Sequence, residues 1–373
     1  MNIILTTGIL LIIVSLLTEK KYKPYVGFAF VFLIMGFQSG VEGDFMGYMQ
    51  EYNGMTGSQA VDSRTIEDEP FFPYLMKFFS FFSPWWLFVI LLSLFEVFVL
   101  EKFVEKHSTG RYQFIAAILF FFSFNMMLMQ MKAMRQGFAI EMLLLSVLLI
   151  EKQKRSRVPW LALLVVAAAF FCHNSAAVAL PFVLLFYFAQ KNPQFLTKRG
   201  NGNLFPIVTL GIYFLVYLLK TTILNDYLIG FAMLSDEDFR LSGYFSEKEM
   251  ENTFNISWLI VLYDAIIVFL VSWYYRFEDS KMRVFCWASI VAAIGDMLFF
   301  GIGSLPRIIM YLVVFNLAVY PAVALKIDKK FGRIWALVFI VLLFGYAIKT
   351  SLPWMLGTDE GRFGTYQFVF WQW

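Results

Sequence analysis

The sequence predicts an all-α integral membrane protein, folded as one polytopic helical bundle of about twelve transmembrane segments, some short or re-entrant. Two observations predict this class. The chain of 373 residues is 60% hydrophobic and 20% aromatic, with a mean hydropathy of +0.68, well above the values of soluble globular domains. Its apolar segments also alternate with loops that are basic and acidic in turn. We therefore treat residues 1–373 as a single transmembrane domain.

Each apolar segment is a candidate membrane crossing. The segments lie near residues 2–18, 25–40, 85–100, 112–131, 133–150, 158–172, 174–190, 204–224, 256–275, 284–303, 307–325 and 334–350. Lysine and arginine concentrate in the loops at residues 19–24, 101–111, 151–157, 190–203, 276–283 and 326–333. By the positive-inside rule these loops are cytoplasmic, and both termini then lie outside.

Two long loops are expected on the outer side. The loops at residues 41–84 and 225–255 contain seven acids each. The first includes an aromatic run up to Phe82 that is too short to cross a membrane, so we expect an interfacial helix there. The second is expected to form a lid or a carbohydrate-facing surface.

The apolar stretch at residues 157–191 is predicted to be two short arms with His173 at the bend, because a single crossing would put later basic loops outside. Each arm would span about 22 Å, against about 30 Å of hydrocarbon. The polar tip of His173, Asn174 and Ser175 is therefore recessed, and protein or water must satisfy its hydrogen bonds.

Two arginines open inward-running helices at the same predicted depth. Arg135 lies in the run Met134-Arg135-Gln136-Gly137, and Arg307 follows Pro306. Guanidinium binds phosphate oxygens through a two-pronged fork, so this pair suits the diphosphate of a polyprenyl lipid, with helix-end amides assisting. The alternative is that both arginines anchor their helices at the membrane surface.

His173 could accept the proton of a sugar hydroxyl or steady a leaving diphosphate; the alternative is a core histidine. Asp44 and Glu69 are candidate bases or sugar-hydroxyl ligands, or ordinary solvated loop acids. Three acids lie within predicted helices, where they either pair with the arginines or line a cavity, and structural pairing is favoured. These are Glu141, Asp264 and Asp296.

Several classes of chemistry lack their motifs. The chain has no glycine-rich phosphate loop, zinc-type cluster or nucleophile elbow, and Cys172 and Cys286 both lie in apolar segments. We therefore expect no metal, no cofactor and no nucleic-acid partner.

Four motifs, in order along the chain, resemble the EpsG family, a branch of the Wzy-like polysaccharide polymerases of bacterial envelopes. A later element, Pro306-Arg307-Ile308 with Tyr311, resembles the family more weakly. The four motifs are Gly43-Asp44 with Tyr48, Glu69-Pro70-Phe71, Met134-Arg135-Gln136-Gly137-Phe138-Ala139, and Phe171-Cys172-His173-Asn174-Ser175-Ala176 ending in Leu180-Pro181.

This resemblance implies a GT-C-like glycosyltransferase fold in the bacterial plasma (inner) membrane. It implies transfer of a growing glycan from undecaprenyl diphosphate to the terminal sugar hydroxyl of another lipid-linked repeat, on the periplasmic or extracellular side. Membrane lipids, a chain-length regulator and a flippase are the expected partners. The implied catalytic residues are His173, Arg135, Asp44 and Glu69, and the implied substrate-binding residues are Arg135, Arg307, Arg240, Gln136, Asn174 and Ser175.

Three other interpretations of the function are also consistent with the sequence. A flippase of lipid-linked oligosaccharide would also carry charged residues within the bilayer, but transporters commonly show repeats, and we find none here. A glycan ligase or a polyprenyl-phosphate-dependent glycosyltransferase would share the arginines and differ in its acceptor or donor. An assembly scaffold would need neither Arg135 nor His173.

Overall fold

Helices make up most of this computed structural model. It describes residues 3–18, 22–39, 44–55, 69–108, 110, 112–153, 158–194, 196, 204–224, 257–300, 306–356 and 367–368. The predicted outer loop at residues 225–255, with Arg240, lies outside the described residues.

The described α-helices range in length from 4 to 24 residues. They are α1 (Ile3–Leu17), α2 (Lys23–Gly36), α3 (Asp44–Met55), α5 (Phe71–Ser80), α6 (Trp85–His107), α7 (Phe114–Phe122), α8 (Met129–Lys132), α9 (Met134–Lys152), α10 (Trp160–Cys172), α11 (Leu180–Lys191), α12 (Phe205–Leu219), α15 (Trp258–Tyr275), α16 (Ser280–Phe299), α17 (Pro306–Val313), α18 (Asn316–Phe331) and α19 (Arg333–Leu356). The remaining elements are the π-helical turns η1 (Phe124–Leu128) and η3 (Lys220–Leu224), the 3₁₀ segment η2 (Asn174–Ala179), and the strands β1 (Gln38–Ser39) and β2 (Gln367–Phe368).

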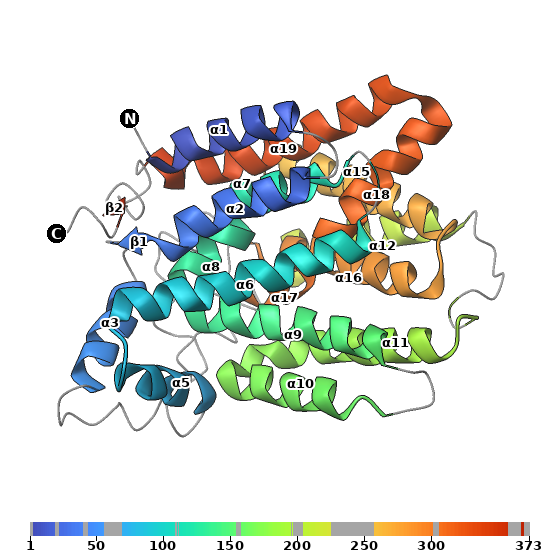
Figure 1. The fold of residues 1–373 in the computed structure, drawn as a ribbon. Helices are drawn as coiled ribbons and strands as arrows, with labels where there is room; N and C mark the ends of the chain where they lie inside the picture. The colour runs from blue at the N-terminus through green and yellow to red at the C-terminus, as the bar shows by residue number, and fades with distance from the viewer. Residues whose placement is uncertain are drawn as a thin grey trace.

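One end of the bundle, which we call the α3/α5 end, gathers α3, α5, the start of α1 and both strands (Figure 1). The strands pair antiparallel, with Gln38 opposite Phe368, so the end of α2 is joined to the C-terminal part of the chain. The described segments nearest the two termini therefore lie at the same end of the bundle. Which side of the membrane this end faces stays a prediction.

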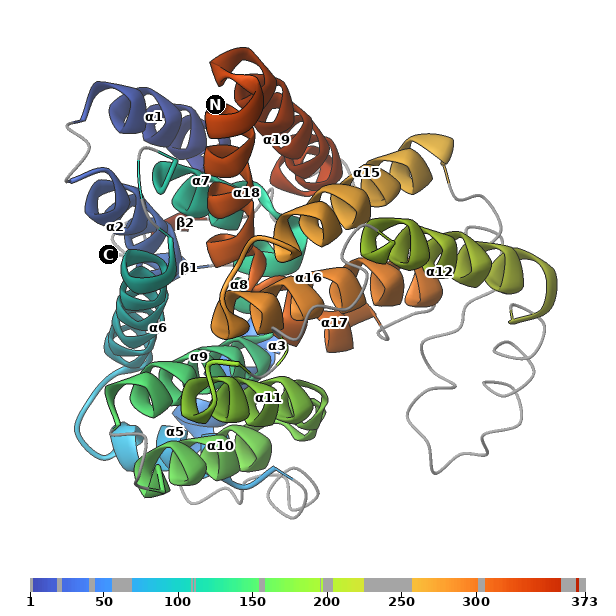
Figure 2. The ribbon, with the colours of Figure 1, turned by 90° about the vertical axis from the view of Figure 1, so that its right-hand side faces the viewer.

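The opposite end, which we call the basic end, gathers the loops that were predicted to be cytoplasmic. Lys106 and Lys281 both form ion pairs with Glu151, and Arg283 donates a hydrogen bond from Nη1 to the carbonyl of Leu196 at 2.6 Å. Four of the predicted cytoplasmic loops thus meet here, and Figure 2 views the bundle from this side. The charge pattern thus grouped these four loops correctly.

The helices are apolar enough to cross a membrane, but the count of twelve is not confirmed. Within the described residues, four helices pass a test of length and composition, or up to six if two bent pairs count as one span each. Three shorter apolar helices accompany them. Large apolar side chains such as Trp160, Ile207 and Val341 face outward with more than half of their surface exposed, which fits contact with lipid. The protein is an all-helical membrane protein, while the GT-C-like arrangement stays a prediction.

Breaks within the apolar segments place polar groups inside the bundle. The predicted bend at His173 is confirmed: α10 ends at Cys172, and His173 has an extended backbone. Two segments predicted as continuous are bent instead, by 52° between α7 and residues 126–132 and by 56° between α17 and α18. Hydropathy does not detect these bends because the residues on both sides of each are apolar.

The close approach of α8 to α9 depends on Gly137. A Cβ atom at this position would lie 3.0 Å from Cβ of Gln130, which is closer than packed carbon atoms normally approach. The glycine that follows Arg135-Gln136 therefore lets the short helix α8 pack on the first turn of α9, where Arg135 lies.

Candidate active site

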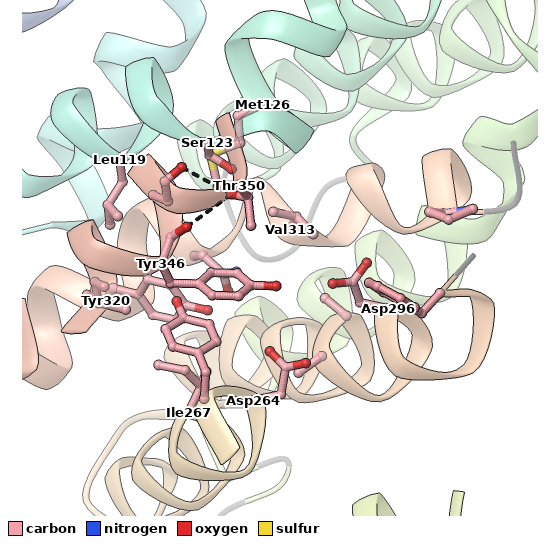
Figure 3. Close-up of a pocket in the computed structure, with 18 residues that line it drawn as sticks. Leu119, Ser123, Met126, Asp264, Ile267, Asp296, Val313, Tyr320, Tyr346 and Thr350 are labelled. Atoms are coloured by element: carbon pink, nitrogen blue, oxygen red, sulfur yellow. Dashed lines mark hydrogen bonds between the residues drawn. The ribbon is translucent and has the colours of Figure 1, made fainter. Parts of the chain in front are cut away.

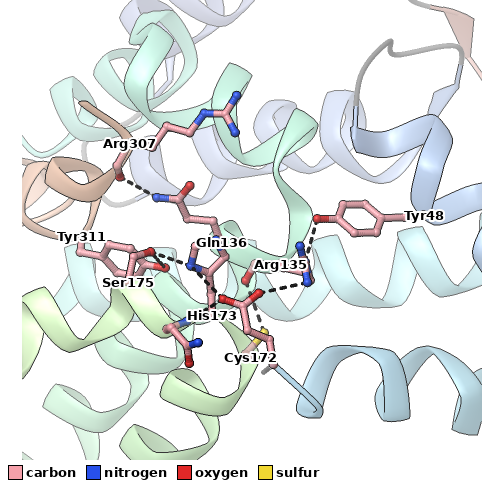
Figure 4. Close-up of polar contacts among 10 residues, drawn as sticks. Tyr48, Arg135, Gln136, Cys172, His173, Ser175, Arg307 and Tyr311 are labelled. Atoms are coloured by element: carbon pink, nitrogen blue, oxygen red, sulfur yellow. Dashed lines mark hydrogen bonds and ion pairs between the residues drawn. The ribbon is translucent and has the colours of Figure 1, made fainter. Parts of the chain in front are cut away.

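Glu69 connects three regions that are far apart in the sequence. Its Oε2 atom lies 3.0 Å from Nη1 of Arg135, in the first turn of α9. Its Oε1 atom accepts a 2.8 Å hydrogen bond from the backbone N–H of Asn174, at the start of η2. Figure 4 shows the neighbouring Tyr48, Arg135 and His173. The loop before α5, the Arg-Gln-Gly motif and the His-Asn-Ser tip therefore meet at one carboxylate.

Arg135 is held in place on a second side by Tyr48 of α3. Its Nε–H donates to the Tyr48 hydroxyl at 2.9 Å, and the guanidinium carbon lies 5.5 Å from the centre of the ring. Burial raises the pKa of Tyr48 to about 12, against the opposing effect of Arg135. Tyr48 is therefore a neutral acceptor that orients the guanidinium.

Ser175 contacts Nδ1 of His173 and also the hydroxyl of Tyr311. The Ser175 hydroxyl donates to the Tyr311 hydroxyl at 3.2 Å, and its Oγ lies 2.6 Å from Nδ1 of His173. Since a serine has only one hydroxyl proton, Nδ1–H must donate to Ser175 in this arrangement. Nε2 then has a free lone pair, and we find no partner for it among the described residues.

The surroundings of His173 favour its neutral form. Burial lowers the pKa of this imidazole below its ordinary value, Glu69 opposes the shift, and Arg135 and Arg307 add to it. The Nδ1 atom is 3.8 Å from Oε1 of Glu69, too far for a hydrogen bond but close enough to stabilise an imidazolium once it forms. His173 is therefore suited to accept a proton at Nε2.

Arg307 lies beside this cluster at the start of α17. Its backbone carbonyl accepts a 2.6 Å hydrogen bond from the Gln136 side chain, which ties α17 to α9. Its Nη1 atom is 3.8 Å from Oδ2 of Asp44, whose side chain is 46% exposed. Asp44 thus lies at the margin of the cluster, and the Arg307 guanidinium makes only this loose ion pair within the described residues.

An apolar cavity adjoins the cluster. Its volume is about 480 Å³, and its walls are formed by Pro70, Phe71, Tyr74, Leu75 and Phe171. Glu69 directly precedes this wall in the sequence, and His173 lies two residues after Phe171. An apolar space therefore begins where the charged cluster ends.

A family model described as the EpsG family matches residues 5–356. The chain belongs to the EpsG family. This membership supports a Wzy-like polysaccharide polymerase, and hence a glycosyltransferase-like enzyme of a bacterial membrane, at the level of the family. No curated protein and no solved structure matches the chain.

Some side-chain contacts within the cluster could not be predicted from the sequence of this EpsG family member. Ser175 and Asn174 were expected to bind substrate, and this stays a prediction. In the structure, Ser175 hydrogen-bonds His173, and the backbone N–H of Asn174 donates to Glu69. Gln136 binds the Arg307 carbonyl. The described residues contain no group of three histidine, cysteine or acidic side chains that could hold a metal ion.

Proposed function

We propose that this EpsG family protein polymerises lipid-linked oligosaccharide repeats. It transfers a growing glycan from undecaprenyl diphosphate to the terminal sugar hydroxyl of another lipid-linked repeat. The observation that carries this proposal is the arrangement at the α3/α5 end: two arginines and a neutral histidine lie together beside an apolar cavity. We place this end on the outer face of the bacterial plasma membrane because the basic loops lie at the other end.

The arginines are suited to the leaving group. When the acceptor oxygen bonds to the anomeric carbon, the bond from that carbon to the diphosphate oxygen breaks, and its electron pair leaves with the diphosphate. Arg135 and Arg307 bind the diphosphate and stabilise the charge that develops. Tyr48 and Glu69 hold Arg135 in position beforehand, so little reorganisation is needed.

His173 is the proposed base. Nε2 takes the proton of the acceptor hydroxyl while Nδ1–H stays bonded to Ser175. Glu69 already accepts two hydrogen-bonding or ionic contacts, so we assign it to positioning Arg135 and stabilising the imidazolium rather than to removing the proton. Asp44, which is more exposed, orients sugar hydroxyls near Arg307. The imidazolium returns its proton to water after transfer.

The apolar cavity is proposed to hold the first isoprene units of the donor lipid. Its walls are almost entirely apolar, and it lies next to Glu69 and His173. A lipid diphosphate needs both a cationic site and an adjacent apolar surface, and the α3/α5 end offers them together.

Reconstitution tests the proposed function. The purified protein, placed in liposomes with the host's undecaprenyl-diphosphate repeat unit and no nucleotide, should produce a ladder of glycans. Lys77→Ala, which removes an exposed cation of α5, is the matched control and should leave the ladder unchanged. Movement of the lipid-linked sugar between leaflets without a ladder would support a flippase. Transfer only to a foreign acceptor would support a ligase.

A further inference from the structure

A second cavity lies between α7, α15, α16, α18 and α19. Its volume is about 300 Å³, at the lower end of the range of about 300–1,000 Å³ for small-molecule sites. Figure 3 shows Asp264, Asp296 and Tyr346 directed towards a common space. The polar residues of its lining are Ser123, Tyr263, Asp264, Asp296, Asn316, Tyr320, Tyr346 and Thr350.

Two acceptors in this lining are deeply buried. Asp264 and Asn316 are each only 6% exposed. Oδ2 of Asp264 and Oδ1 of Asn316 are buried, and neither atom makes a hydrogen bond of normal geometry within the described residues. The hydroxyls of Tyr213 and Tyr320 lie near the Asp264 carboxyl and the Asn316 amide, respectively. Contrary to the favoured prediction, no described ion pair joins Asp264 or Asp296 to an arginine. Because unsatisfied buried acceptors are costly, they indicate a ligand that donates hydrogen bonds.

The charges around the cavity argue against an ionic or apolar ligand. Lys220 is fully buried, donates from Nζ to the carbonyls of Met297 and Phe300, and interacts electrostatically with Asp296. This lysine reduces the need for a bound cation. The two carboxyl groups disfavour a phosphate or a lipid chain. A neutral molecule with several hydroxyl donors fits best.

An aromatic wall completes the chemistry of a sugar site. The rings of Tyr263 and Tyr346 are stacked, with centroids 3.8 Å apart and an angle of 13° between their planes. The two facing sides of this pair cover each other, so a sugar packs its C–H face on the outer face of Tyr346. The hydroxyls of the sugar then donate to carboxylate and amide oxygens.

Helix α17 places this cavity next to the His173 cluster. Pro306 and Val313, seven residues apart and thus on one face of the helix, line the cavity. Arg307 and Tyr311 contact Gln136 and Ser175 on another face. The two sites are therefore on two sides of a helix about 12 Å long.

We infer that this cavity is a carbohydrate subsite, which holds a sugar of the acceptor glycan while its terminal hydroxyl reacts at His173. The inference rests on the proposed function for the identity of its ligand. Asp264 and Asn316 accept hydrogen bonds from the sugar, and Tyr346 packs against its ring.

Binding of the free sugar tests this subsite separately from catalysis. The probe is the repeat-unit oligosaccharide released from its lipid carrier, titrated by calorimetry into the full-length protein in detergent. Asp264→Asn and Asn316→Ala should each weaken binding about tenfold. Glu141→Gln neutralises another buried acid, outside this lining, and should leave binding unchanged. Size-exclusion profiles and Tm values verify that each variant is folded.

Equal affinity of the folded Asp264→Asn and Asn316→Ala variants and the wild type would overturn the subsite. The same holds if the wild type produces a glycan ladder but does not bind the probe. If the wild type forms no ladder, yet both variants weaken binding, the subsite stands and the proposed polymerase function fails.

Discussion

Each end of the bundle contains a glutamate in contact with a histidine and at least one cation, but the two clusters differ in how exposed the glutamate is and how closely the basic groups are paired. At the basic end, the side chain of Glu151 is 3% exposed and contacts Lys106 and Lys281 at Nζ and His107 at Nε2. At the α3/α5 end, the side chain of Glu69 is 15% exposed.

The two clusters differ mainly in how many close contacts their basic side chains already make. The Glu151 cluster joins the ends of α6, α9 and α16, and its carboxylate lies within 3.1 Å of all three basic side chains. The Glu69 cluster leaves Nε2 of His173 without a partner among the described residues, and Arg307 makes only a 3.8 Å ion pair. A carboxylate that all its basic neighbours contact closely is suited to joining helices. A cluster in which a guanidinium and an imidazole nitrogen lack close partners is suited to binding a substrate.

Replacing Arg135 should have the largest effect on activity. Arg135→Ala removes the guanidinium that stabilises the leaving diphosphate, and we expect kcat to fall about 1,000-fold. Arg135→Lys should recover little, because an ammonium lacks the planar fork. Initial rates of glycan formation at equal membrane abundance measure both variants. A kcat within twofold of the wild type for Arg135→Ala would assign this residue to anchoring instead.

Removing the base should have the next largest effect. His173→Ala is expected to lower kcat about 100-fold, the contribution of general-base catalysis at its lower end. The KM for the donor should change little, because the arginines still bind the diphosphate. A raised KM with an unchanged kcat would instead mean that the imidazole only binds substrate.

At the basic end the expected effect is on stability. Burial would raise the pKa of Glu151, but His107, Lys281 and Lys106 together lower it to about 2. Because the folded pKa is depressed, the stabilisation is complete above the ordinary value of 4.5 and is lost as pH falls towards about 2. Glu151→Gln should cost about 2 kcal/mol at pH 7, visible as a lower Tm, and the difference from wild type should shrink in acid.

The smallest expected effect comes from Glu69→Gln. Glu69 raises the pKa of His173 against the dominant effect of burial, so losing its charge should lower that pKa further. The acid limb of the pH–rate profile, already expected below the ordinary histidine value of 6.5, should move to lower pH. Loss of the contact to Arg135 should reduce kcat about tenfold. An acid limb that stays in place would show that Glu69 does not act through His173.

Local patterns predicted the parts of the molecule that depend on charge and hydropathy. Basic loops identified one end of the bundle, and the polar tip at His173 identified a helix break. Contacts between segments that are distant in the sequence could not be predicted from it. Tyr48 reaches Arg135 from α3, and Lys220 reaches the end of α16, and no local pattern links these pairs. The bend between α17 and α18 also escaped prediction, because both helices are apolar there.

The most direct test of this comparison is glycan polymerisation in liposomes by the wild type, Arg135→Ala and Lys281→Ala at equal abundance. Each variant removes one cation from a glutamate-centred cluster, one at each end of the bundle. The wild type and the folded fraction of Lys281→Ala should give equal rates of ladder formation, and Arg135→Ala should give almost none. Equal ladders from Arg135→Ala and the wild type, or a loss of activity in folded Lys281→Ala, would contradict the account.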